Sequence, residues 1–203
     1  MTETDNFPWQ IKKMLDNKEP RELKASKMNY IHAAVLVPLF KNDRGYHILF
    51  TERTHKVEHH KGQISFPGGA VESQDKSYEE TALREACEEI GLLPKHVEVL
   101  GRLDDETTVA SQFIVHPFVG LIPHPYGFKI NQAEVEKLIY VPFNFFLSDD
   151  PAHKCSSIDF DDFTYHGTVY LHQGDVIWGA TARIMDHFIR EIQDNLHIKS
   201  DDV

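Results

Sequence analysis

Three glutamates, Glu85, Glu88 and Glu89, are separated by three and four residues within one short stretch of the chain. In an α-helix, side chains at these spacings lie on neighbouring parts of one surface, so their negative charges repel one another. A divalent cation would relieve this repulsion, and Mg²⁺ prefers oxygen ligands and bridges protein carboxylates to substrate phosphates. On the spacing alone, a solvated acidic helix face is the favoured interpretation, and a metal site for phosphate chemistry is the alternative that the surrounding sequence must decide.

The surrounding residues predict the helix that would carry this cluster. Ser77, followed three residues later by Glu80, has the pattern of a capping box at a helix start. Gly91, just after the periodic stretch, is typical of a helix end. We therefore expect a helix over residues 78–90, with the glutamates on its second half.

Strands and helices are mixed along the rest of the chain. Apolar runs typical of buried strands occupy residues 30–40, 46–51, 97–103 and 113–121. The first two flank a polar turn and predict a hairpin. Residues 9–18 and 181–192 have the apolar spacing of amphipathic helices. Residues 148–162, which are rich in aspartate, are expected to form a solvated loop, with an excursion near the substrate as the alternative.

The composition limits the class of protein. Hydrophobic residues make up 41% and charged residues 26% of the 203 residues, which is typical of one globular domain. The formal charge of −11 argues against binding a nucleic acid polymer, because Lys and Arg would have to supply the phosphate contacts. We expect an N-terminal helical extension over residues 1–28 packed on a domain of residues 29–195, and a flexible tail over residues 196–203.

Two features bear on where the protein works. Cys87 and Cys155 are the only cysteines, and the N-terminus lacks a basic region followed by an apolar run. No stretch reaches the roughly 20 apolar residues that span a bilayer as a helix. These features predict a cytoplasmic protein without a membrane partner, and they leave a homodimer open.

The second half of the predicted helix resembles the Nudix box, whose pattern is G-x5-E-x7-R-E-U-x-E-E-x-G-U with U an aliphatic residue. The matching residues here are Arg84, Glu85, Ala86, Cys87, Glu88, Glu89, Ile90, Gly91 and Leu92. The first half departs from the pattern, because Lys76 stands where the box has glutamate. A one-residue insertion restores Gly69 as the first glycine and puts Asp75 in the acidic position.

The segment LFTERTHKVEHHKGQISFPGG, residues 49–69, resembles the signature of the coenzyme A pyrophosphatase subfamily. It carries Arg53, His60, Gln63 and Gly68 at signature positions, whereas Glu58 stands where the signature has arginine. A carboxylate in place of a guanidinium would repel a substrate phosphate. The resemblance thus extends to the subfamily, while the substrate does not follow from it.

These resemblances imply a Nudix-type α/β/α sandwich with a mixed β-sheet, and a hydrolase of diphosphate linkages that uses Mg²⁺ or Mn²⁺. They imply metal ligation by Glu85, Glu88, Glu89 and the main chain of Gly69. Arg84 would orient a catalytic glutamate, and a turn at Gly68 and Gly69 would bring main-chain groups close to metal or phosphate.

The same resemblances imply the contacts of a small nucleotide-diphosphate substrate, with coenzyme A or an acyl-CoA as the first choice. Arg53, His60, Gln63 and Gly68 are the candidates for binding it. Nucleotide sugars, dinucleoside polyphosphates and noncanonical nucleoside triphosphates are alternative substrates, and a nucleotide sensor without turnover is the alternative outside catalysis.

Glu85 and Glu134 are both candidates for the general base that activates water. Glu88, which lies next to Glu85 on the predicted helix, is included among the catalytic candidates. A second acidic run, Asp104 to Glu106, is predicted to be a solvated turn and not a ligand set.

Overall fold

The computed structural model describes residues 6–23, 30–54, 62–108, 112–148, 150, 152–160 and 163–198. Its elements in chain order are α1 (Phe7–Asp16), β1 (Ile31–Asn42), β2 (Gly45–Arg53), β3 (Ile64–Ser65), β4 (Gly68–Ala70), α2 (Tyr78–Ile90), the 3-10 turn η2 (Pro94–His96), β5 (Glu98–Arg102), β6 (Glu106–Thr107), β7 (Phe113–Leu121), β8 (Val135–Pro142), α3 (Phe143–Leu147), β9 (Lys154–Asp159), β10 (Thr164–His172), β11 (Asp175–Ile177) and α4 (Gly179–Leu196). Among the described helices, none is long and apolar enough to cross a membrane.

The main sheet is mixed, and β1 lies at its centre. Within the described ranges it contains eight strands, with β7 paired in parallel along one edge of β1. Along the other edge, β1 pairs antiparallel first with β4 and then with β2. The predicted hairpin is confirmed, since Leu39 of β1 and Ile48 of β2 are register partners.

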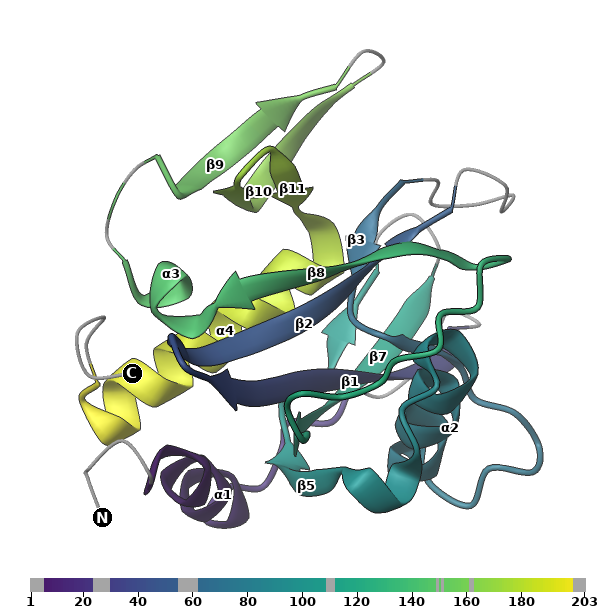
Figure 1. Ribbon diagram of the computed structural model, residues 1–203. Helices are drawn as coiled ribbons and strands as arrows, with labels where there is room; N and C mark the ends of the chain where they lie inside the picture. Colours follow the sequence, from purple (N-terminus) through teal and green to yellow (C-terminus); the bar gives the residue numbers. More distant parts are fainter. Residues whose placement is uncertain are drawn as a thin grey trace.

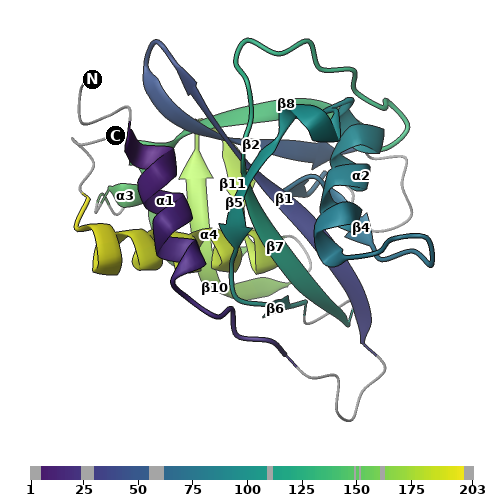
Figure 2. The same cartoon turned by 90° about the horizontal axis from the view of Figure 1, so that it is seen from below.

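Helices cover both faces of this sheet, as Figures 1 and 2 show. On β1, the side chain of Leu36 packs with Ala82 and Ala86 of α2, whereas Val37 packs in the cluster that contains α1, α3 and α4. Side chains that alternate along a strand point to opposite faces, so β1 is buried on both sides. The three layers confirm the expected α/β/α architecture.

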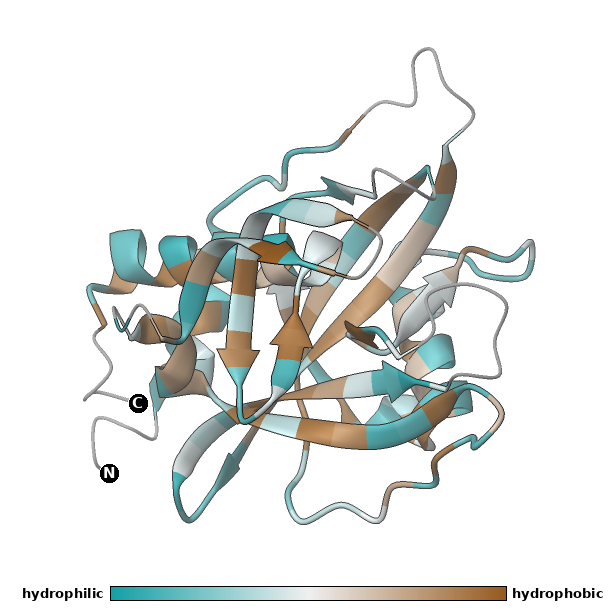
Figure 3. Cartoon of the chain, turned by 90° about the horizontal axis from the view of Figure 1, so that it is seen from above, coloured by the Kyte–Doolittle hydropathy of each residue, from teal (hydrophilic) through white to brown (hydrophobic). Residues whose placement is uncertain are grey.

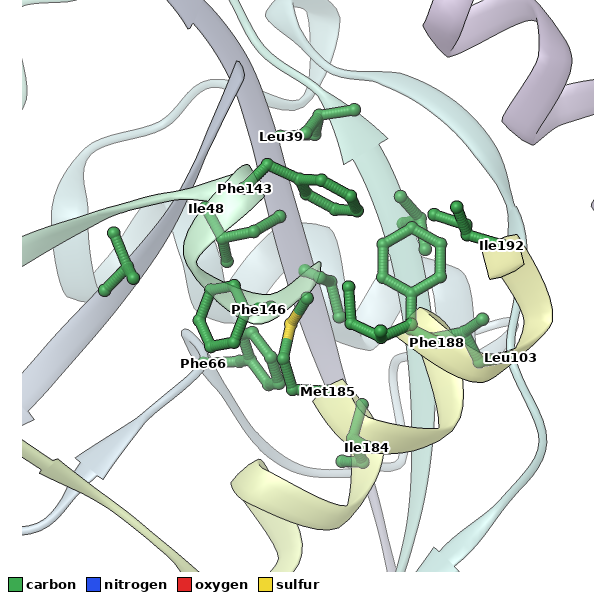
Figure 4. Close-up of a cluster of buried hydrophobic side chains, with 14 of the residues drawn as sticks. Leu39, Ile48, Phe66, Leu103, Phe143, Phe146, Ile184, Met185, Phe188 and Ile192 are labelled. Atoms are coloured by element: carbon green, nitrogen blue, oxygen red, sulfur yellow. The ribbon is translucent and has the colours of Figure 1, made fainter. Parts of the chain in front are cut away.

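The larger hydrophobic cluster joins α3 and α4 to the sheet. Phe143 and Phe146 of α3 and Met185 and Phe188 of α4 point toward one another over Ile48 of β2 (Figure 4). In Figure 3, long stretches of the strands are hydrophobic, whereas the outer connections are largely hydrophilic. The core therefore fixes the sheet and leaves its edges and loops for polar chemistry.

The N-terminal helix packs on this cluster as a part of it. Ile11, Met14 and Leu15 are buried, as the apolar spacing predicted. The helix begins at Phe7, two residues before the predicted start, because Pro8 fits the first turn of a helix, where its missing N–H is not needed. Phe7 adds edge-to-face contacts with Tyr46 and Phe143.

The prediction of a solvated loop over residues 148–162 is wrong for its second half. Residues of β9 pair antiparallel with β10, and β11 completes a small three-stranded sheet that stands above the body in Figure 1. Most side chains of β9 are exposed. Without a buried face, the sequence of this strand lacks the alternation by which a strand is recognised.

Candidate active site

Helix α2 has the predicted bounds and the predicted caps. The Ser77 hydroxyl accepts a hydrogen bond of 3.1 Å from the Glu80 main-chain N–H. The Glu80 carboxylate, however, accepts from the N–H of Lys76, 2.7 Å away, so the reciprocal arm of the capping box is shifted by one residue. Gly91 ends the helix in the left-handed conformation, with φ of 69°.

The three glutamates of α2 lie in different environments. Glu89 is buried, with only 3% of its surface exposed, whereas the Glu88 side chain is 56% exposed. Glu85 is partly buried against β4, because a Cβ atom placed on Gly69 would lie 2.5 Å from its Cδ. The helix therefore directs two carboxylates toward the sheet and one toward solvent.

The predicted turn at Gly68 and Gly69 is wrong, since both residues belong to the short strand β4. Gly68 is the register partner of Val35 and Gly69 that of Ala34 on β1. Glycine is needed at position 68 because the Cβ atom of any other residue would collide with the carbonyl oxygen of Ala34 on β1. The expected close approach of the main chain is nevertheless present, and Figure 2 shows β4 beside α2.

Arg84 joins the loop before α2 to the glutamates. Its Nη1 donates to Glu85 Oε1 at 2.8 Å and to Glu88 Oε2 at 3.0 Å. Its other nitrogens donate to Asp75 and to the Ala70 carbonyl. A planar guanidinium with this many partners has one orientation, so the direction of the Glu85 carboxylate is set by Arg84.

The Glu89 carboxylate is poorly compensated by the protein. Its closest cation is Arg53, with Nη1 lying 3.7 Å from Glu89 Oε1. Glu89 Oε2 has no hydrogen-bond partner in the described part of the chain. Burial raises the pKa of Glu89 to about 8; Arg53 and the Gly68 main chain oppose this shift, and the charges of Glu85 and Glu134 add to it.

Glu134 approaches the same group from another direction. It precedes β8, and its negative charge contributes to the raised pKa of both Glu85 and Glu89. For Glu85 the larger cause is burial, which Arg84 opposes. The structure thus brings together five charged side chains that the sequence predicted for the site: Arg53, Arg84, Glu85, Glu89 and Glu134.

Residues 126–134, the capping segment, close the end of α2 and lead to Glu134. The N–H groups of Lys129 and Asn131 donate to the carbonyls of Ile90 and Glu89 at 2.9 and 2.8 Å. The Tyr126 hydroxyl donates to the Gly91 carbonyl at 3.2 Å. These contacts satisfy carbonyls that a helix end leaves unpaired, and they were not predicted.

The remaining predicted site residues differ in how far the structure describes them. His60 lies outside the described residues. Gln63 is half-buried, and its carbonyl accepts from the Arg53 N–H at 3.0 Å, which places it at the base of the loop that β2 and β3 flank. Among the described side chains, no three acidic, histidine or cysteine groups converge tightly enough to enclose a metal ion.

The prediction of a solvated turn at residues 104–106 is wrong for Asp105, which is 3% exposed. Its Oδ1 accepts from Arg102 at 2.6 Å and lies 2.7 Å from His116 Nδ1, while its Oδ2 accepts from the Leu23 N–H. His116 Nε2 in turn lies 2.9 Å from Nδ1 of His32. This buried polar chain lies beneath the first residue of α2, since the Tyr78 ring stacks on His116.

Comparison with known proteins fits this arrangement. The sequence model of the NUDIX domain matches residues 30–154. The chain belongs to the Nudix hydrolase family. A Nudix hydrolase of Photorhabdus laumondii, NudL, named as uncharacterized, is 36% identical over 170 residues, which cover 81% of this chain and 87% of that protein. Its namesake in Pectobacterium atrosepticum is 38% identical over 166 residues, covering 80% and 83%.

A solved structure extends the likeness over the fold. A MutT/nudix family protein from Enterococcus faecalis superposes with a TM-score of 0.58, at 14% identity, over 98% of this chain and 73% of that one. At this identity the comparison shows the Nudix fold alone. Together with its Nudix hydrolase relatives, the chain is an enzyme of the Nudix pyrophosphohydrolase type.

Proposed function

We propose that this Nudix enzyme is a divalent-metal-dependent hydrolase that cleaves the diphosphate linkage of a nucleoside diphosphate derivative, with coenzyme A or an acyl-CoA as substrate. The observation that carries the proposal is the buried Glu89 carboxylate beside Glu85. Glu89 Oε2 has no hydrogen-bond partner among the described residues, and the neighbouring charges of Glu85 and Glu134 disfavour its ionisation. A cation there would offset a cost that the described residues compensate only in part.

The donor set fits Mg²⁺ or Mn²⁺, which prefer carboxylate, carbonyl and water oxygens. Glu85, Glu88 and Glu89 would hold the ion, together with the main chain of Gly69, which lacks a side chain that would displace Glu85. When bound, such an ion neutralises charge on phosphate oxygens and lowers the pKa of water.

Hydrolysis forms one phosphorus–oxygen bond to water and breaks the bond from phosphorus to the bridging oxygen, while the water loses a proton. Glu85 and Glu134 are the two candidates to accept that proton, because both lie in the carboxylate group and both are bound to orienting neighbours. Arg84 keeps the Glu85 carboxylate directed toward β4. This orientation matters because a proton acceptor must point at the reacting water to accept its proton.

The coenzyme A assignment is supported by residues 49–69. The base of this segment is closed by two main-chain hydrogen bonds, from Arg53 N–H to the Gln63 carbonyl and from Gly62 N–H to the Arg53 carbonyl. Arg53 also lies next to Glu89. Arg53 and Gly69 of this segment thus lie beside Glu89 and Glu85. Arg53, His60, Gln63 and Gly68 would contact the diphosphate there.

The proposal is tested by incubating the protein with coenzyme A and either Mg²⁺ or Mn²⁺ and resolving the products by mass. We expect 4′-phosphopantetheine and adenosine 3′,5′-bisphosphate, and no products after chelation of the metal. A parallel panel of nucleotide sugars, dinucleoside polyphosphates and nucleoside triphosphates identifies the substrate class. Cleavage of another compound in place of coenzyme A would overturn the substrate assignment and keep the chemistry.

Glu89→Gln supplies the matched variant, because it keeps the shape of the side chain and removes its charge. We expect metal-dependent turnover to fall by about a hundredfold or more. Glu79→Gln makes the same change at an exposed position on the same helix and should leave turnover within about twofold of the unaltered protein. Equal activity of the Glu89 variant and the unaltered protein would contradict the proposed metal site.

A further inference from the structure

Asn131 lies where the capping segment connects the end of α2 to Glu134. Its main-chain N–H donates to the Glu89 carbonyl at 2.8 Å. Its own carbonyl accepts from the N–H groups of Glu134 and Val135, at 3.0 and 2.9 Å. The backbone of Asn131 therefore joins the last turn of α2 to the start of β8.

The side chain of Asn131 makes a separate pair of contacts. Its Oδ1 accepts from the Ala133 N–H at 3.1 Å, and its Nδ2 donates to Glu134 Oε1 at 3.1 Å. Since the Ala133 N–H can only donate, it requires the amide oxygen on its side. The amide nitrogen is consequently fixed toward the Glu134 carboxylate.

The backbone of this turn is also held from β2. The Thr54 N–H donates to the Glu134 carbonyl at 2.9 Å, and the Thr54 hydroxyl donates to the Ala133 carbonyl at 3.2 Å. With its main chain fixed between two elements, Glu134 retains freedom only in its side-chain torsions. The Asn131 amide contacts the end of that side chain.

An orienting donor is needed because the group around Glu134 is acidic. Its carboxylate lies near those of Glu85 and Glu89, and like charges repel at short range. This repulsion favours rotation of the Glu134 side chain away from the other two carboxylates. Asn131 opposes this rotation without adding a charge of its own.

We propose that Asn131 is a positioning residue for the hydrolytic reaction, whose side-chain amide orients the Glu134 carboxylate toward the α2 glutamates. This inference rests on the proposed function and on the role of Glu134 in it. Asn131 acts through Glu134 alone, since its contact with α2 uses the main chain and is independent of the side chain.

The variant that tests this role is Asn131→Asp, which keeps the acceptor for the Ala133 N–H and replaces the donor to Glu134 by a repelling oxygen. We expect kcat to fall by about tenfold to a hundredfold, as for other residues that orient an active-site group, with KM changed by less than about threefold. Asn144→Asp makes the same change at an exposed residue of α3 and should leave both constants unaltered.

A double-mutant cycle with Glu134→Gln separates this role from a structural one. In the Glu134→Gln protein, Asn131→Asp should change kcat by less than about twofold, because the group through which it acts has been removed. An undiminished effect in that background would overturn the inference, as would a Glu134→Gln protein with full activity. If Asn131→Asp does not fold, Asn131→Ser provides the same cycle, since serine retains an acceptor and removes the amide donor.

The two proposals fail in different ways. If the unaltered protein releases no product from any diphosphate in the presence of metal, the proposed function is contradicted and the role of Asn131 with it. If the unaltered protein is active and Asn131→Asp has the same kcat, only the role of Asn131 is contradicted. Thermal unfolding of each variant shows whether the fold is kept.

Discussion

Arg84 donates two parallel hydrogen bonds to Asp75, from Nε to Oδ1 and from Nη2 to Oδ2, each 3.0 Å long. Arg84 lowers the pKa of the nearly buried Asp75 carboxyl group, and Thr81 donates a further hydrogen bond to it. Asp75 is the residue that a one-residue insertion puts in the acidic position of the Nudix box. The structure pairs Arg84 with this residue, while Lys76 contributes its N–H to Glu80.

Replacing Asp75 tests how strongly the loop before α2 supports the site. Asp75→Asn removes the bidentate anionic partner of Arg84 and leaves it with Glu85 and Glu88, which should lower the free energy of unfolding by about 1.5–3 kcal/mol. Because Arg84 then has freedom to turn from Glu85, kcat should fall about tenfold or more. Urea unfolding and steady-state kinetics measure the two effects, and Lys76→Gln, a neighbour with an exposed side chain, is the control. Unchanged stability would show that the pair contributes nothing.

The two glycines of β4 should respond differently to alanine. At Gly69 the added Cβ meets the end of the Glu85 side chain, which can move, so stability should change little while turnover falls about a hundredfold. At Gly68 the Cβ meets the main chain of Ala34 and Val35, which cannot move easily, so the fold should lose about 3 kcal/mol.

Gly127→Ala is the control for this pair, because a Cβ there meets no atom within 4 Å. Chemical unfolding and kcat are measured for all three variants. If Gly69→Ala retains full turnover, the approach of β4 to Glu85 has no part in the reaction.

The buried pair of His116 and Asp105 predicts a contribution to stability that is lost in mild acid. Burial lowers the pKa of His116, although Asp105 opposes this shift. Below about pH 6.5 the unfolded chain therefore binds a proton at His116 that the folded chain excludes, and this contribution lowers the free energy of unfolding by up to about 1.4 kcal/mol per pH unit as the pH falls. Arg102, which also faces His116, adds to the exclusion. Glu89, with its raised pKa, contributes in the opposite direction over this range.

Urea unfolding at pH 7.5, 6.5 and 5.5 measures this slope. His116→Gln removes its contribution, so the free energy of unfolding should fall less, or rise more, between pH 7.5 and 5.5 than in the unaltered protein, although the variant is less stable at pH 7.5. His166→Gln, at an exposed position of β10, should leave the slope unchanged. An equal slope in the His116 variant would assign the acid sensitivity to other groups.

Tyr126 tests the capping segment. Its hydroxyl donates to the Gly91 carbonyl and lies 3.1 Å from the N–H of Leu93, which donates to it. Tyr126→Phe leaves these groups unpaired at the end of α2 and should lower the free energy of unfolding by about 1–2 kcal/mol. The melting temperature should drop by about 3–6 °C. Tyr140→Phe, an exposed tyrosine, is the control, and an equal shift for both would contradict a capping role.

Features decided within a few residues could be predicted from sequence. The bounds of α2 follow from Ser77 at one end and Gly91 at the other, and each acts on main-chain groups in the adjacent turn. The difference in solvent exposure between Glu88 and Glu89 was not predicted, because it depends on which side of α2 faces the sheet. The position of Glu89 next to Arg53 of β2 likewise depends on packing between distant segments.

Features decided by distant pairing could not be predicted. Asp105 is buried because residues 21–23, more than 80 positions earlier, supply an N–H that binds its carboxylate. From sequence, Gly68 and Gly69 predict a turn, since two glycines have no side-chain pattern by which to recognise a strand. Only their pairing with β1 shows that they belong to one. Asn131, three residues before Glu134, could have been found, because asparagine commonly binds its own backbone in turns.

Main-chain hydrogen bonds join Arg53, at the end of β2, to Gly62 and Gln63, which precede β3. The glutamates of α2 are held by other contacts. Arg84 binds the Glu85 carboxylate, the Glu85 side chain packs against β4, and the capping segment binds the main-chain carbonyl of Glu89. The two sets of contacts have no hydrogen bond in common. In evolutionary terms, this separation would let the sequence near the proposed substrate contacts change while the proposed reaction centre is kept.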